Sequence, residues 1–130
     1  MSRLLVVDDD PVVLNLVEIR LKNGGHRVIT AGGPEEALRL IDTHGVPDLA
    51  VLDVTLPGMT GLDLLGQLRS RPGAASLPTI FLSARVLQAD IEAGRSLGAT
   101  YLTKPFVASA LLAAVDRELA AATAAVPDGW

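Results

Sequence analysis

Short apolar runs alternate along this chain with longer segments in which apolar residues recur every three or four positions. The short runs occupy residues 4–7, 27–30, 49–52, 79–82 and 101–103. Each run has the length of a strand, and nearly uninterrupted apolar strands are typical of a sheet that is covered on both faces. Because helical segments separate the runs, the pattern predicts an α/β fold: a (βα)5 doubly wound parallel sheet with right-handed crossovers.

Residues that start or stop helices mark the boundaries of the helical segments. Asp10 followed by Pro11 forms an N-cap with proline in the first turn, and Gly24 and Gly25 end the helix that follows. We expect its recurring apolar positions to face the core; they are Val13, Leu16, Val17 and Leu21. The next two helices are predicted to begin at Pro34 and after a turn at Pro57 and Gly58.

The last two helices differ in how clearly the sequence marks them. The helix predicted over residues 86–97 is the weakest, because Gly94 lies inside it. The final helix has a clean apolar stripe and is expected to reach about residue 124. We therefore predict one domain over residues 1–124, with residues 125–130 forming a C-terminal tail or the start of a linker.

Composition narrows the classes of function. The chain has 130 residues, of which 49% are hydrophobic, so it fits one domain with a substantial core. Its net charge is −4 and it has no block of Lys and Arg, so direct binding to nucleic acid or to an anionic membrane is not expected. It has no cysteine, apolar segment of membrane-spanning length or signal-peptide pattern, and a cytoplasmic location is the expectation. His26 and His44 are interpreted as surface residues.

Polar residues stand where the apolar runs stop. Asp8 and Asp9 follow the first run, and Asp53, Ser83 and Lys104 follow the third, fourth and fifth. Since ligands of open parallel sheets bind outside the carboxyl ends of the strands, these side chains are expected to meet in one crevice. Three carboxylates, a hydroxyl and an ammonium suit a hard cation such as Mg²⁺ together with a phosphoryl group. Asp53, opposite Asp9, has the position of a nucleophile that forms an acyl phosphate.

Each of these residues also has a simpler explanation. Asp10 is sufficiently explained as a helix cap, and Ser83 has the same explanation for the helix that follows it. Asp53 could simply open the turn at Thr55 to Gly58, since aspartate is common at the start of turns. Lys104 followed by Pro105 is compatible with a turn alone. Three adjacent carboxylates are harder to explain in this way, because their mutual repulsion calls for a cation.

Taken in order, these motifs resemble the receiver domain of bacterial two-component response regulators, over residues 3 to about 122. Leu-Val-Val-Asp8-Asp9 is similar to the family's acidic pair, and Leu52-Asp53 with Pro57-Gly58 and Gly61 to its phosphoacceptor turn. Leu82-Ser83-Ala84 is similar to the family's hydroxyl position, and the segment from Tyr101 to Phe106 to its lysine motif. The resemblance implies a flavodoxin-like sheet with strand order 2-1-3-4-5, an order that is also that of the chemotaxis member of this family.

The resemblance also implies a role for each residue. Asp53 would accept a phosphoryl group from a sensor histidine kinase or a phosphotransfer protein. Asp8, Asp9, Asp53 and the backbone carbonyl of Thr55 would hold Mg²⁺, with Asp8 acting through water. Lys104 would pair with the phosphoryl group, Ser83 would move to bond it, and Tyr101 would turn inward behind Ser83.

These roles describe a phosphoacceptor signalling domain rather than an enzyme acting on other substrates, because it catalyses only its own phosphotransfer and dephosphorylation. The switching surface would comprise the helix at 86–97, the strand at 101–103 and the final helix. Its partner would be a downstream protein effector or an output domain that is absent from this chain. The sequence does not identify the kinase, the regulated process, the phosphoryl lifetime or the oligomeric state.

Two other readings of the same residues are possible. Haloacid-dehalogenase-type phosphatases place their nucleophile in an Asp-x-Asp motif after the first strand, which Asp8 and Asp10 imitate. Those enzymes need a further acidic pair after the lysine, whereas the acids after Lys104 are only Asp116, Glu118 and Asp128. A receiver-like module that is never phosphorylated would keep the fold without the chemistry, and the intact acidic set disfavours it.

Overall fold

The computed structural model describes residues 2–83, 99–104 and 106–124. Five parallel strands form its main sheet: β1 (Arg3–Val7), β2 (Arg27–Ala31), β3 (Leu49–Asp53), β6 (Thr79–Ser83) and β7 (Thr100–Thr103). Their order across the sheet is β2-β1-β3-β6-β7. If β6 and β7 are counted as the fourth and fifth strands of this sheet, the order is 2-1-3-4-5, as predicted.

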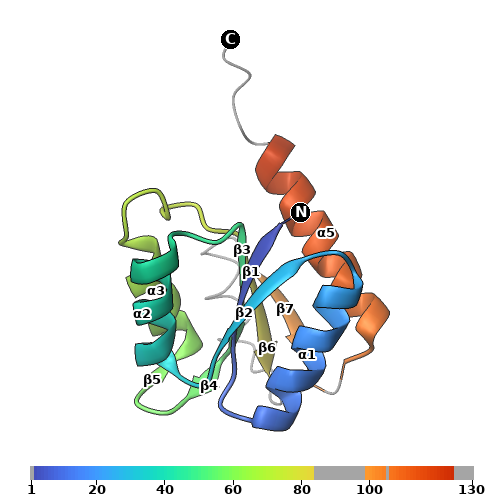
Figure 1. Cartoon of the computed structure of the whole chain (residues 1–130), viewed down its shortest axis with the longest axis horizontal. Helices are drawn as coiled ribbons and strands as arrows, with labels where there is room; N and C mark the ends of the chain where they lie inside the picture. Colours follow the sequence, from blue (N-terminus) through green and yellow to red (C-terminus); the bar gives the residue numbers. More distant parts are fainter. Residues whose placement is uncertain (1, 84–98, 105, 125–130) are drawn as a thin grey trace.

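Helices cover both faces of the sheet. The described helices are α1 (Pro11–Asn23), α2 (Pro34–His44), α3 (Gly61–Arg69) and α5 (Ala108–Ala124). Figure 1 shows α2 and α3 on one side of the strands and α1 and α5 on the other. The helix predicted over residues 86–97, its end at Gly98, the Lys104–Pro105 turn and the tail at 125–130 involve residues outside the described ones.

The alternation of side chains along the strands divides the core into two layers. Leu5, Val7 and Phe81 belong to the layer beneath α2 and α3, whereas Val6 and Ile80 belong to the layer beneath α1 and α5. Strands β3 and β6 are buried along their whole length. Because both faces of these strands are covered, their residues are almost all apolar, which is why they stood out in the sequence.

The structure corrects three local expectations. A short hairpin of β4 (Thr55–Leu56) and β5 (Met59–Thr60) surrounds the expected turn, where Gly58 has a φ of 84°. Leu16 is 43% exposed rather than in the core, because it lies about 100° around α1 from the buried Val17. His26 is less exposed than expected for a surface histidine, since its residue is of intermediate burial and its side chain is 11% exposed.

None of the helices within the described ranges combines the length and the apolar character that crossing a bilayer requires.

Candidate functional site

The first strand presents two adjacent carboxylates at its carboxyl end. Asp8 is buried, and its N–H continues the strand ladder by donating to the Ala31 carbonyl at 3.2 Å. The Asp8 carboxylate accepts the N–H of Asp10 at 2.9 Å. Asp10 itself caps α1 by accepting the Val12 N–H at 2.9 Å, as expected for a cap, while Asp9 between them is exposed. The tight turn therefore fixes Asp8 inside the site and leaves Asp9 at its solvent side.

Asp53 is the last residue of β3 and is 7% exposed. Its carboxylate accepts the N–H of Thr55 at 3.2 Å, which orients it over the strand ends. The backbone around it is held tightly, because Val54 donates to the Leu82 carbonyl at 3.0 Å and Gly61 donates to the Val54 carbonyl at 2.7 Å. A Cβ atom at Gly61 would collide with the Asp53 carbonyl oxygen, so only glycine fits at this start of α3.

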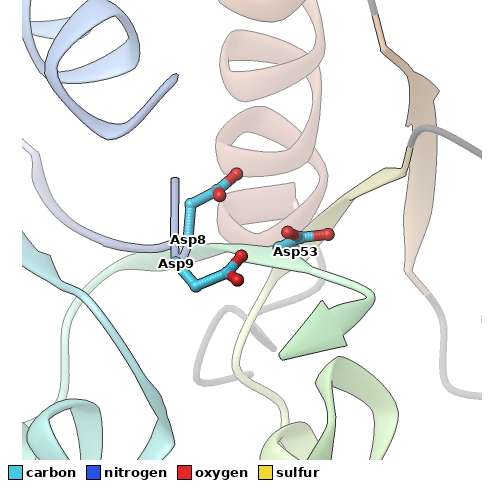
Figure 2. A group of neighbouring side chains, drawn as sticks. All are labelled: Asp8, Asp9 and Asp53. Atoms are coloured by element: carbon cyan, nitrogen blue, oxygen red, sulfur yellow. The ribbon is translucent and has the colours of Figure 1, made fainter. Parts of the chain in front are cut away.

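The three carboxylates converge at one edge of the sheet. One oxygen each from Asp8, Asp9 and Asp53 lies within 4.8 Å of the others. Figure 2 shows the three side chains leaving β1 and β3 toward a common space. The sheet register explains the convergence: Val7 pairs with Leu52, so Asp8 and Asp53 each follow a residue of the same pair.

Lys104 follows β7, an edge strand of the sheet that lies two strands away from β3, and its side chain reaches this group. Its Nζ lies 2.7 Å from Asp8 Oδ2 and 3.3 Å from Asp53 Oδ2. Its backbone N–H donates to the Ser83 carbonyl at 2.7 Å and so extends the pairing of β6 and β7 beyond Thr103. The ammonium reaches both buried carboxylates because its backbone is anchored at this point.

Burial and neighbouring charges both shift the pKa values of Asp53 and Lys104. Burial, followed by the charge of Asp8, raises the pKa of Asp53, although the Thr55 N–H and Lys104 partly oppose this rise. Burial acts to lower the pKa of Lys104, but the hydrogen bond and charge of Asp8, and then those of Asp53, raise it above its ordinary value. One ammonium therefore neutralises Asp53 incompletely, and the site favours additional positive charge.

The donor set fits a hard divalent cation. All three side chains are carboxylates that approach one another closely, and Mg²⁺ binds through oxygen ligands and commonly uses one or two carboxylates. Burial, and after it the charge of Asp8, raises the pKa of Asp53, so a nearby cation would stabilise its ionised form.

The other predicted site residues lie around this group. Ser83 is buried at the carboxyl end of β6, and Thr55 is exposed just after Asp53. Tyr101 lies half-buried on β7, and its ring packs against Phe81 with ring centroids 5.2 Å apart. The structure thus brings Asp8, Asp9, Asp53 and Lys104 together. Ser83 ends the neighbouring strand β6 and Thr55 begins β4, whereas Tyr101 lies further back, in β7 opposite Phe81. The contacts that position Asp8 and Asp53, through Asp10 and Gly61, were not apparent from the strand-end pattern.

Comparisons with known proteins agree with this geometry. Residues 4–116 match the family model described as the response regulator receiver domain. The transcriptional regulatory protein KdpE of Mycobacterium tuberculosis is 42% identical over 94% of this chain and 54% of its own length. The alkaline phosphatase synthesis transcriptional regulatory protein PhoP of Bacillus subtilis is 41% identical over 81% of this chain and 43% of its own. The chain spans about half the length of these curated relatives.

Solved structures give the same result. A putative response regulator from Chloroflexus aurantiacus has a TM-score of 0.83 and 38% identity, with 92% of this chain and 98% of the other covered. A CheY-like receiver domain protein from Methanospirillum hungatei has a TM-score of 0.86 and 26% identity, with coverage of 95% and 98%.

Proposed function

Because this chain belongs to the receiver domain family of two-component response regulators, we propose that it is phosphorylated on Asp53. The observation that carries the proposal is the position of Asp53. It ends the central strand β3, with the Asp8 and Asp9 carboxylates within 4.8 Å and the Lys104 ammonium 3.3 Å away. The phosphoryl donor would be the phosphohistidine of a sensor histidine kinase or of a phosphotransfer protein.

The proposed transfer is a simple displacement at phosphorus. A carboxylate oxygen of Asp53 attacks the phosphorus and forms an acyl phosphate, while the phosphorus–nitrogen bond of the phosphohistidine breaks and its electron pair stays on the imidazole. Burial raises the pKa of Asp53, which makes the carboxylate a better nucleophile than an exposed one once it is ionised.

Mg²⁺ would be held by Asp8, Asp9, Asp53 and the backbone carbonyl of Thr55, with Asp8 acting through water. When bound, it would offset the repulsion between the carboxylates and the incoming phosphoryl group. Lys104 adds a positive charge that stays close to Asp53 because Asp8 holds its Nζ at 2.7 Å. The Ser83 hydroxyl, at the end of the neighbouring strand β6, would bond a phosphoryl oxygen after transfer.

Phosphorylation would then shift the surface that includes β7 and α5. Lys104 provides the link, since its backbone pairs with Ser83 and its side chain contacts Asp53. Tyr101 of β7, whose ring packs on Phe81 of β6, the strand that ends at Ser83, would follow the movement of Ser83. The predicted helix at 86–97 would complete this surface. The readout would be a protein effector or an output domain, and the expected location is the cytoplasm.

Labelling with a small phosphodonor tests the proposal. With acetyl phosphate and Mg²⁺, the native chain should gain one phosphoryl group by intact mass, and chelation of Mg²⁺ by EDTA should abolish the gain. Asp53→Asn should remove it entirely. Asp10→Asn is the matched control, because asparagine caps a helix as well as aspartate does and labelling should persist. Labelling that survives Asp53→Asn but is lost in Asp8→Asn would instead identify a strand-one nucleophile, as in the phosphatases.

A further inference from the structure

A cavity lies at the opposite end of the sheet from Asp53. Its volume is about 190 Å³, and its walls come from the first residues of β1 and β2 and from the end of α2. Arg3, Arg27 and His44 contribute its basic side chains, and Ile29 and Pro47 contribute apolar surface. The cavity is smaller than the roughly 300–1,000 Å³ typical of sites for drug-sized ligands, so a ligand would have to be small.

The sheet register brings the two arginines together. Arg3 pairs with Arg27, and Ile29 lies two residues further along the same face of β2. Among the described residues that line the cavity there is no acidic side chain. Two arginines therefore gather, with His44 beside them, at one hollow in a chain whose net charge is −4. A concave site lined by charges of one sign concentrates ions of the opposite sign.

Among the described residues, neither guanidinium at the cavity is paired with a carboxylate. The Arg3 guanidinium donates to the carbonyls of His44 at 3.3 Å and Val46 at 2.6 Å, which are neutral acceptors. The nearby Asp48 carboxylate accepts the backbone N–H of Arg3 at 2.8 Å instead. Arg27 is exposed, and its guanidinium has no partner among the residues that the structure describes. Arg27 is thus free to bind a ligand, while Arg3 shapes the site.

We propose that this cavity binds a small organic anion: a carboxylate or phosphate monoester carried on a short apolar chain. Arg27, with a fork of donors suited to carboxylate and phosphate oxygens, would bind the charged group, and Arg3 would add to the positive potential. The apolar chain would lie against Ile29 and Pro47. The proposal does not involve Asp53, so it stands or fails independently of the proposed phosphorylation.

Nuclear magnetic resonance titration of the whole chain tests this site directly. Butyrate and butyl phosphate should produce saturable shifts of the Val28, Ile29 and Gly45 backbone amide signals. Butan-1-ol, which has the same apolar chain without the charge, should not produce them. Inorganic phosphate, which lacks the apolar chain, should bind more weakly than butyl phosphate. The proposal is overturned if neither organic anion gives saturable shifts, if butan-1-ol matches them, or if inorganic phosphate binds as tightly as butyl phosphate.

Two variants distinguish specific binding in this cavity from non-specific electrostatic attraction to surface arginines. Arg27→Gln should weaken butyrate binding roughly tenfold, the loss expected for one charge-assisted hydrogen bond. Arg39→Gln removes an exposed arginine of α2 that does not line this cavity, and it should leave the affinity unchanged. Equal weakening by the two substitutions would overturn the proposal.

Discussion

At the scale of single residues, Asp53 stands out because a carboxylate is costly to bury beside another carboxylate. It is 7% exposed and shares its space with a second buried carboxylate, Asp8. The single ammonium of Lys104 lies closer to Asp8, at 2.7 Å, than to Asp53, at 3.3 Å. Asp53 thus has the longer contact with the ammonium, and burial, followed by the charge of Asp8, raises its pKa.

This imbalance predicts that Asp53→Asn stabilises the chain at neutral pH in metal-free buffer. Burial raises the pKa of Asp53 above 3.8, so the folded chain holds this proton more tightly than the unfolded chain does. The resulting penalty is absent below pH 3.8, grows as the pH rises through the raised pKa, and is complete above it. Removing the charge removes the penalty, so the melting temperature should rise at pH 7 and the gain should shrink toward pH 4.

Thermal unfolding of the native chain and the variant across this pH range provides the measurement. Asp42→Asn is the control, since Asp42 is an exposed carboxylate already paired with Arg71 and its removal should give no gain. A lower melting temperature for Asp53→Asn at pH 7 would mean that Lys104 compensates Asp53 fully.

At the residue scale, the sequence allowed prediction where a charged residue directly follows an apolar strand. The Asp8–Asp9 pair, Asp53 and Lys104 are far apart in the chain, yet the structure gathers them at one edge, as the strand-end pattern predicted. What the pattern did not show is how unequally the charges are shared. That depends on a difference of less than 1 Å in the reach of Lys104, which side-chain packing sets.

At the scale of elements, the junction between β3 and α3 controls the position of Asp53. The β4–β5 hairpin returns the chain so closely that Gly61 lies against the Asp53 carbonyl and donates its N–H to Val54. The hairpin itself was missed in the sequence, because strands of two residues carry no measurable periodicity. Only the Pro57–Gly58 turn at its tip was predicted.

Two glycines of α3 should respond in opposite ways to alanine. Gly61→Ala places a Cβ against the Asp53 carbonyl and should destabilise the fold by about 1–3 kcal/mol, as overpacking does. Gly66→Ala in the same helix meets nothing within 4 Å and should stabilise it by roughly 0.5–1 kcal/mol. Urea unfolding measures both changes.

Labelling of Asp53 by acetyl phosphate should also slow in Gly61→Ala and not in Gly66→Ala, because only the first displaces the Asp53 backbone. If the two alanine variants were equally stable and equally reactive, the close approach at Gly61 would have no functional consequence.

At the scale of the whole molecule, the strands of the parallel sheet differ in how deeply they are buried. The sequence predicted the strand order through family resemblance and the paired helix layers through alternation, and both were confirmed. The degree of burial could not be predicted in the same way. β3 and β6 are entirely buried, whereas β7, at the edge, is half-buried to exposed, although all three were selected by similar apolar runs. An edge position results from the topology rather than from the strand's own residues.

These differences in strand burial predict the pattern of amide hydrogen exchange. Amides of β3 and β6 should exchange only through global unfolding, because both neighbours and both faces must be lost first. Amides of β7, which pairs on one side with β6 among the described strands, should exchange through a smaller local opening and therefore faster. The edge strand β2 is expected to lie between these limits, since its last residue, Ala31, is fully buried and accepts the N–H of Asp8.

The difference between β7 and the central strands has a consequence for switching. β7 leads directly into Lys104, so an opening that costs less than global unfolding would let Tyr101 and Lys104 rearrange while the Asp8–Asp53 edge stays folded. Beryllofluoride, as a phosphoryl analogue on Asp53, should slow exchange in β7 by adding a negatively charged partner for Lys104 and should leave β3 unchanged. Asp53→Asn with the same reagent is the control and should show no slowing. Exchange in β7 as slow as in β3 before any addition would show that the sheet opens only as one unit, and the strand would then have no separate freedom to act as a switch.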